Sequence, residues 1–355
     1  MIPLMEYNWD TPAVVIDRAV AEANIDAFQA HCDEHNLAVR PHIKTHKLGY
    51  FARYQVAAGA VGITCQKIGE AEAMAEAGIE DILLSFNILG SAKLSRLKAL
   101  AKRLKKLTLV ADNATVVAGL AATFTESQQA IDLLVECDTG AQRCGVQNPQ
   151  QALALAQQID AAKGLNFAGL MTYPGNNMHA QVSAQLDAVV QTLAQAGLTC
   201  QTISSGGTPD LWQAATVAQV TEYRPGTYIY NDRSLVQYGT CDWQQCALRV
   251  VATVISTPAP GRAIIDAGSK VLSSDLLGLP DYGYLPGFDR VSLYALSEEH
   301  GHLRWPGDEA LFEVGQQVQI IPNHACVVSN LVGQVWLHID GQWQRHDVDA
   351  RGLVV

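Results

Sequence analysis

The stretch Ile82–Val110 reads ILLSFNILGSAKLSRLKALAKRLKKLTLV and contains two apolar runs on either side of a helical pattern. The runs at 82–85 and 107–110 lack the alternation of polar and apolar residues, as expected of strands in a parallel sheet with both faces covered. Residues 91–105 between them are long enough for a crossover helix. The stretch therefore predicts one strand–helix–strand unit.

The same alternation continues through the first two thirds of the chain. Gly78, Gly164 and Gly197 stand where helices would end. Helical patterns occur at 69–77, 91–105, 149–162 and 180–196. Strands are predicted at 39–43, 61–64, 82–85, 107–110, 133–136, 167–172, 202–204 and 219–222. Eight strands that alternate with helices predict a (β/α)8 barrel of the TIM type, with an open doubly wound sheet as the alternative.

After about Tyr238 the pattern changes to short strands joined by turn-rich segments. The strand-like segments are 248–256, 262–266, 291–296, 317–321 and 334–339, and no helical period is visible among them. We therefore predict two domains, a barrel at 12–238 and an all-β C-terminal domain at 239–355. The N-terminal strand at 14–17, followed by a helix at 19–36, fits either domain.

Composition narrows the class of protein. With 24 Lys and Arg against 35 Asp and Glu among 355 residues, the formal charge of −11 argues against a nucleic-acid partner. Hydrophobic residues make up 48%, which excludes a disordered chain, yet no apolar run is long enough for a membrane helix. The 8 cysteines are scattered without paired spacing, which favours reduced thiols and a cytoplasmic location.

Reactive residues follow several predicted strands, and in a parallel barrel the carboxyl ends of the strands form one rim where active sites are built. So many polar groups at one rim are hard to explain as packing. They are the stretch Arg40–Lys47, then Gln66, Asp138 and Arg143, Tyr173 with His179 beyond it, Ser204–Thr208, and Arg224–Tyr228.

Two features of this rim indicate a phosphate-bearing cofactor. The Gly206-Gly207 pair would expose backbone N–H groups after the seventh strand, where barrels commonly bind phosphate, although an ordinary turn has the same residues. Lys44 would need a partner or a covalent role at a buried strand end, and a salt bridge at the rim is the simpler alternative. A lysine and a phosphate site on one rim are what pyridoxal phosphate requires.

The stretch Arg40-Pro41-His42-Ile43-Lys44-Thr45-His46-Lys47 resembles the lysine motif of the fold-type III pyridoxal-phosphate enzymes related to D-threonine aldolase and D-serine dehydratase. The resemblance covers nearly the whole chain and implies an alanine-racemase-like barrel, a C-terminal β domain and a homodimer. Its other motifs are Thr11-Pro12, Asp138-Thr139-Gly140 through Arg143-Cys144-Gly145-Val146, Ser205–Pro209, Glu222–Tyr228, Asp266–Lys270 and Pro322–Cys326.

The resemblance also implies roles for individual residues. Lys44 would bind the cofactor covalently, Arg143 would contact its phenolic oxygen and Tyr173 would pack against its ring. Gly206, Gly207 and Thr208 would hold the phosphate. The predicted cofactor-binding set is Lys44, Gln66, Arg143, Tyr173, Ser205, Gly206, Gly207, Thr208 and Tyr228.

A metal pair is implied at His324 and Cys326, because the related enzymes hold a divalent ion there with His-x-Cys or His-x-Asp. We expect the two side chains to lie on one face of a strand. Imidazole and thiolate favour Zn²⁺, whereas a carboxylate would suit Mn²⁺ or Mg²⁺ better. The remaining ligand positions would take water and the β-hydroxyl of the substrate.

The chain is thus expected to be a lyase acting on a small β-hydroxy-D-amino acid. His179 matches the histidine that D-threonine aldolases use as a base, which favours cleavage to glycine and an aldehyde. Cys326 instead matches the dehydratase type of metal pair, so a dehydratase acting on D-serine or 3-hydroxy-D-aspartate is the alternative. A racemase, a cofactor-binding protein without turnover, and a surface role for His179 also remain open.

Overall fold

The computed structural model describes residues 9–127 and 130–355, which divide into two compact units. The barrel unit comprises residues 26–44, 48–226 and 353–355, and the β unit comprises the described residues of 1–25, 45–47 and 227–352. Helix α1 (Arg18–Glu34) begins in the β unit and ends in the barrel unit.

Eight parallel strands form the sheet of the barrel unit, in the order β2-β9-β8-β7-β6-β5-β4-β3. A bridge between His42 and Thr64 joins the segment after β2 to β3, so the two ends of the sheet meet. This confirms the predicted barrel over the open sheet. The strands are β2 (Ala38–Val39), β3 (Ile63–Cys65), β4 (Asp81–Leu84), β5 (Lys106–Ala111), β6 (Ile131–Cys137), β7 (Leu165–Thr172), β8 (Thr202–Ser205) and β9 (Glu222–Tyr223).

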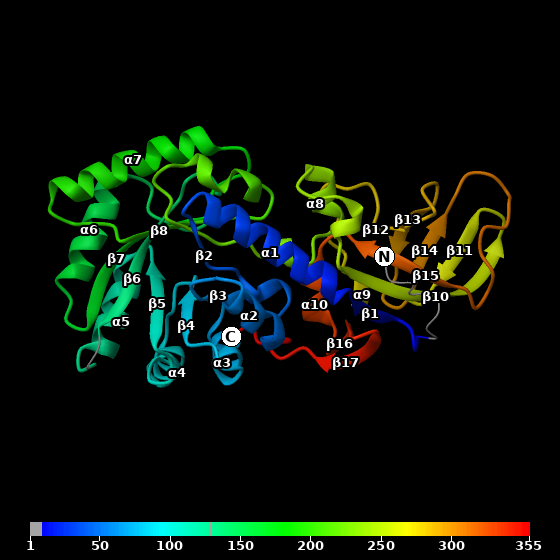
Figure 1. Ribbon diagram of the computed structural model, residues 1–355, viewed down its shortest axis with the longest axis horizontal. Helices are drawn as coiled ribbons and strands as arrows, with labels where there is room; N and C mark the ends of the chain where they lie inside the picture. Colours follow the sequence, from blue (N-terminus) through cyan, green and yellow to red (C-terminus); the bar gives the residue numbers. More distant parts are fainter. Residues whose placement is uncertain (1–8, 128–129) are drawn as a thin grey trace. The chain divides into compact units, whose positions relative to one another are not determined.

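Helices cover the outer face of these strands, as Figure 1 shows for α3 to α7. Asn113 and Asn148 begin two of them, because their side chains accept hydrogen bonds from the N–H groups of Val116 and Gln151. The helices are α2 (Gly49–Ala57), α3 (Ile68–Glu76), α4 (Ser91–Ala101), α5 (Ala114–Phe124), α6 (Pro149–Asp160) and α7 (His179–Gln195), with 3₁₀ turns η2 (Ile43–Thr45) and η3 (Leu211–Thr216).

The first strand is shorter than the predicted 39–43. It ends at Val39, and Pro41, which has no N–H to donate to a ladder, precedes the 3₁₀ turn that carries Lys44. The chain nevertheless stays in register, because the N–H of His42 donates to the carbonyl of Pro225 at 2.8 Å. Lys44 therefore lies just beyond the carboxyl end of β2.

The β unit is built mainly from strands, with β1 (Ala13–Ile16) antiparallel to β10 and parallel to β16. The other strands are β10 (Leu248–Ala259), β11 (Arg262–Ile265), β12 (Gly283–Tyr284), β13 (Ser292–Leu296), β14 (Gly301–Arg304), β15 (Gln317–Pro322), β16 (Gln334–Ile339) and β17 (Gln342–Asp347). The all-β expectation overlooked short helices, which are too brief for a period to show. They are α8 (Arg233–Tyr238), α9 (Ser269–Leu272) and α10 (Ala325–Leu331), with 3₁₀ turns η4 (Thr227–Ile229) and η5 (Trp243–Gln245).

In the described part of the chain, none of the helices combines the length and apolarity that a bilayer crossing requires. All eight cysteines are described, and each is a free thiol.

Candidate active site

Lys44 follows a chain of hydrogen bonds that links three strand ends of the barrel unit. Its backbone N–H donates to Nδ1 of His42 at 3.2 Å, and Nε2 of His42 lies 3.0 Å from Oε1 of Gln66. The Gln66 amide in turn donates to the carbonyl of Ser85 at 3.2 Å. Since Nδ1 accepts, Nε2 carries the proton and donates to Gln66. The backbone at Lys44 is therefore fixed, while among the described residues none pairs with its ammonium group.

The segment after β8 forms a cradle of backbone N–H groups at Gly206, Gly207 and Thr208. No described residue accepts a hydrogen bond from these three groups. A Cβ on Gly206 would lie 2.6 Å from the carbonyl oxygen of Arg224, so only glycine fits there. The Thr208 hydroxyl accepts from the N–H of Gly226 at 3.1 Å, which leaves its proton available. Three unsatisfied donors and a free hydroxyl are suited to a phosphate.

Arg143 and Tyr173 come together at the same rim, from the loops after β6 and β7. The guanidinium carbon of Arg143 lies 4.8 Å from the centre of the Tyr173 ring, and 37% of Tyr173 is exposed. The Asp138 carboxylate shapes the first loop by accepting from the N–H groups of Gly140 at 3.0 Å and Gln142 at 3.1 Å. A flat ring and a cation are thus both presented at the rim.

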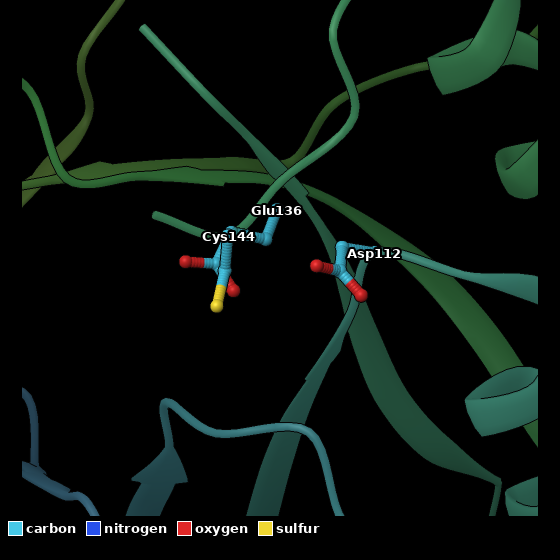
Figure 2. A group of neighbouring side chains, drawn as sticks. All are labelled: Asp112, Glu136 and Cys144. Carbon is cyan, nitrogen blue, oxygen red and sulfur yellow. The ribbon is translucent and has the colours of Figure 1, made fainter. Parts of the chain in front are cut away.

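Asp112, Glu136 and Cys144 gather at the ends of β5 and β6, with their ligand atoms within 4.8 Å of one another (Figure 2). Burial raises the pKa of Glu136 to about 7, with Arg143 opposing the shift and Asp112 adding to it. Asp112 accepts from Asn87 at 2.8 Å and from the Gly145 N–H at 3.0 Å. Because Arg143 is adjacent to the group and Asp112 is already hydrogen-bonded, we interpret it as an anchor of the Arg143 loop.

Opposite charges also compensate one another inside the barrel. Arg40, which is 5% exposed, lies 2.6 Å from Glu222 and 2.7 Å from Asp81. Glu222 accepts from the Ser204 hydroxyl at 2.5 Å, and Arg224 donates to that hydroxyl at 2.6 Å. Burial lowers the pKa of Arg224 to about 10 despite the attraction of Glu222. This network fixes the ends of β8 and β9, between which the cradle begins.

His179 begins α7, beyond the loop that carries Tyr173. Its Nε2 lies 3.8 Å from the Asp210 carboxylate and, among the described residues, has no hydrogen-bond partner. Asp210 follows the cradle by two residues, and its side chain accepts from the N–H of Asn177 at 2.7 Å. The imidazole therefore lies on the cradle side of the barrel unit, next to a carboxylate.

In the β unit, His324 and Cys326 lie close enough for the charge of the cysteine sulfur to raise the pKa of the imidazole. The sequence suggested that the two side chains lie on one face of a strand, and this expectation is wrong. Strand β15 ends at Pro322, His324 is the N-cap of α10 and Cys326 lies in its first turn. The hydroxyls of Thr45 and Thr227 lie 3.0 Å and 3.4 Å from the Cys326 sulfur.

Sequence reasoning missed Asp232, which lies beside this pair and is fully buried. Burial would lower the pKa of His324, but Cys326 and Asp232 outweigh it and raise the pKa to about 11. The negative charge that holds a proton on the imidazole would equally attract a divalent cation, and a metal competes with protons for such ligands. An imidazole beside a thiolate is a donor set that Zn²⁺ prefers.

The residues predicted for the cofactor divide between the units. Lys44, Gln66, Arg143, Tyr173 and the cradle from Ser205 to Thr208 belong to the barrel unit. Tyr228, which is buried, and the half-buried His324 and Cys326 belong to the β unit. The free donors of the cradle and the unpaired Lys44 fit pyridoxal phosphate, which would take its phosphate at the first and its carbonyl carbon at the second.

A parallel barrel with a lysine and a glycine-rich cradle at its rim, followed by a β unit, is the arrangement of one class of pyridoxal-phosphate enzymes. A family profile described as the alanine racemase N-terminal domain matches residues 16–234, and one described as a putative serine dehydratase domain matches residues 247–338. The chain belongs to the fold-type III pyridoxal-phosphate family of lyases that has this barrel.

Two relatives and one solved structure match nearly the whole chain, across both units. The chain is 38% identical to a D-threonine aldolase of Arthrobacter sp., over 97% of this chain and 93% of the relative. It is 32% identical to the D-threo-3-hydroxyaspartate dehydratase of Delftia sp., over 89% of this chain and 91% of that one. The crystal structure of D-threonine aldolase from Filomicrobium marinum superposes with a TM-score of 0.89 at 30% identity, covering 98% and 96% of the two chains.

Proposed function

We propose that the protein cleaves β-hydroxy-D-amino acids by a retro-aldol reaction, with D-threonine giving glycine and acetaldehyde. The observation that carries this proposal is His179, an imidazole beside Asp210 at the cradle side of the barrel unit. Cleavage of the Cα–Cβ bond requires a base for the hydroxyl proton, and a histidine can take that proton near neutral pH. The 38% identity to a D-threonine aldolase supports the same reaction.

In this proposal the barrel unit supplies most of the residues that bind the cofactor, and the β unit supplies Tyr228. Pyridoxal phosphate, when bound, supplies an electron sink for the charge that develops at the substrate's Cα. Lys44 would hold the cofactor, the N–H groups of Gly206, Gly207 and Thr208 would bind its phosphate, and Arg143 would bind its phenolic oxygen. The proposed cofactor-binding set also includes Gln66, Ser205, Tyr173 and Tyr228. His179 then receives the proton of the β-hydroxyl.

His324 and Cys326 would hold a divalent metal through Nε2 and the sulfur, with Zn²⁺ favoured over Mn²⁺ or Mg²⁺. The metal would supply a Lewis acid for the substrate's hydroxyl. A metal-free structure of a cysteine-to-alanine mutant of a D-threo-3-hydroxyaspartate dehydratase superposes on this chain with a TM-score of 0.87, at 30% identity. Its description supports a metal in the family.

A dehydratase that converts D-serine or 3-hydroxy-D-aspartate to a 2-oxo acid and ammonia is the second candidate. Cys326 favours it, because the family resemblance implies a His-x-Cys metal pair for the dehydratases. We further propose a cytoplasmic homodimer made of a barrel domain at 12–238 and a β domain at 239–355. The free thiols of all eight cysteines suit a reducing compartment.

The test is a panel of β-hydroxy-D-amino acids, assayed after chelation and again with added Zn²⁺ or Mn²⁺. Glycine plus acetaldehyde from D-threonine supports the aldolase, whereas pyruvate plus ammonia from D-serine supports the dehydratase. His179→Ala should lower cleavage by about 10²–10⁴-fold, the usual contribution of a general base, and spare any dehydration. Gln185→Ala, at an exposed site on the same helix, is the matched control. An equal loss of both activities in His179→Ala would contradict the role of His179.

A further inference from the structure

Asp232 stands between His324 and the starts of two helices, and its side chain is fully buried. It is the N-cap of α8, where one carboxylate oxygen accepts from the N–H of Leu235 at 3.1 Å and from the hydroxyl of Ser234 at 2.6 Å. A buried charge persists only where hydrogen bonds or opposite charges compensate its desolvation. The hydrogen bonds that Asp232 accepts therefore compensate its burial.

The second oxygen of Asp232 serves the proposed metal pair. It lies 3.0 Å from Nδ1 of His324 and 3.0 Å from the backbone nitrogen of Ala325, the residue between the two proposed ligands. Each oxygen thus accepts two hydrogen bonds, which uses the usual capacity of a carboxylate. Asp232 is consequently saturated by protein groups and unsuited to bind the metal directly.

The contact with Nδ1 decides which nitrogen of His324 can bind a metal. A carboxylate only accepts hydrogen bonds, so the proton of a neutral imidazole must be on Nδ1. The lone pair then lies on Nε2, which points away from Asp232. The same oxygen also holds the Ala325 N–H, so it fixes the backbone that joins His324 to Cys326.

We propose that Asp232 is a positioning residue, which keeps His324 as the Nδ1–H tautomer with Nε2 directed at a divalent cation shared with Cys326. This inference rests on the proposed metal pair. Carboxylates in this position orient metal-binding histidines, and their loss usually costs 10–100-fold in metal affinity.

The experiment measures Zn²⁺ affinity of the pyridoxal-phosphate-loaded protein by competition with a chromophoric chelator. Asp232→Asn keeps the shape but can donate its amide to Nδ1, which would move the imidazole proton to Nε2. We expect Zn²⁺ to bind about 10–100-fold more weakly to this variant. In the Co²⁺-substituted protein, the thiolate-to-metal absorption band should persist, because Cys326 still binds.

A double-mutant cycle separates this role from a general loss of structure. Asp232→Asn should weaken Zn²⁺ binding in the wild-type background. In the His324→Ala background, Asp232→Asn should weaken Zn²⁺ binding by less than about twofold further, because Asp232 acts through His324. Ser234→Ala, which removes one partner of the other oxygen, is the matched control and should change Zn²⁺ affinity less than Asp232→Asn does. If Asp232→Asn does not fold, Asp232→Glu, which displaces the carboxylate by one methylene, undergoes the same cycle.

Each outcome has a separate meaning. If Asp232→Asn lowers Zn²⁺ affinity equally in the wild-type and His324→Ala backgrounds, or in neither, the proposed role of Asp232 is wrong. The proposed metal pair is not contradicted by that result. If His324→Ala alone leaves Zn²⁺ affinity unchanged, the proposed metal pair itself is wrong, and the inference fails with it.

Discussion

The cradle after β8 predicts that Gly206→Ala will weaken the binding of pyridoxal phosphate. The added Cβ would lie 2.6 Å from the carbonyl oxygen and 2.8 Å from the nitrogen of Arg224, closer than real Cβ contacts come. Arg224 cannot yield, because its side chain is buried and its guanidinium donates to Ser204 at 2.6 Å and to the Thr172 carbonyl at 2.8 Å. The cradle must therefore move away from the phosphate.

The size of the effect follows from the hydrogen bonds lost. A hydrogen bond to a charged group contributes about 1.5–3 kcal/mol, and each 1.4 kcal/mol is tenfold in affinity. Loss of one of the three N–H contacts should thus raise Kd for pyridoxal phosphate about 10–150-fold. The covalent link to Lys44 is common to pyridoxal and pyridoxal phosphate, so the ratio of their dissociation constants isolates the phosphate contacts.

Both constants can be measured by titrating the cofactor-free protein and following absorbance. We expect the preference of the wild type for the phosphorylated compound to fall by the same 10–150-fold in Gly206→Ala. Gly119→Ala is the matched control, because its Cβ would meet only the Leu94 side chain, at 3.6 Å. A Gly206→Ala protein with an unchanged preference would refute the cradle as the phosphate site.

Two predictions concern buried charges of the barrel unit. Arg40→Met should lower the free energy of unfolding by about 3–5 kcal/mol in urea titrations, because it leaves Glu222 buried with its ion pair broken. A change below about 1 kcal/mol would show that Ser204 and Arg224 compensate the buried charge of Glu222. Glu136 has a folded-state pKa raised from 4.5 to about 7. Its stabilising contribution is therefore present below pH 4.5 and lost as pH rises through about 7. Glu136→Gln should thus gain stability relative to wild type between pH 5 and pH 8, by up to roughly 3 kcal/mol. A difference in urea midpoint that stays constant over this pH range would contradict the raised pKa of Glu136.

The barrel could be predicted because each strand–helix unit carries its own local signal. Residues 82–110 contain the complete pattern, and the structure has β4 at Asp81–Leu84, α4 at Ser91–Ala101 and β5 at Lys106–Ala111. The order of strands then follows from short right-handed connections. The rim residues could be found in the same way, because parallel strands place their carboxyl ends together.

The conformation around His324 could not be predicted, because a tertiary contact determines it. The strand-like segment at 317–321 suggests that the strand continues, yet the Asp232 carboxylate accepts from the Ala325 N–H and helix α10 begins there. Asp232 itself has a local signal, since aspartate is a preferred N-cap and begins α8. That signal predicts a helix start but gives no hint of a histidine 92 residues away.

The structure also explains how one fold can carry both of the reactions named among its relatives. Proteins 28–38% identical to this chain are named as aldolases and as a dehydratase. The lysine and cradle that suit the cofactor are common requirements of both reactions. The groups proposed to choose between them lie in different units, His179 with Asp210 in the barrel unit and His324 with Cys326 and Asp232 in the β unit. A base and a metal centre on separate segments can change independently, so a few substitutions can redirect which bond breaks while the barrel stays the same.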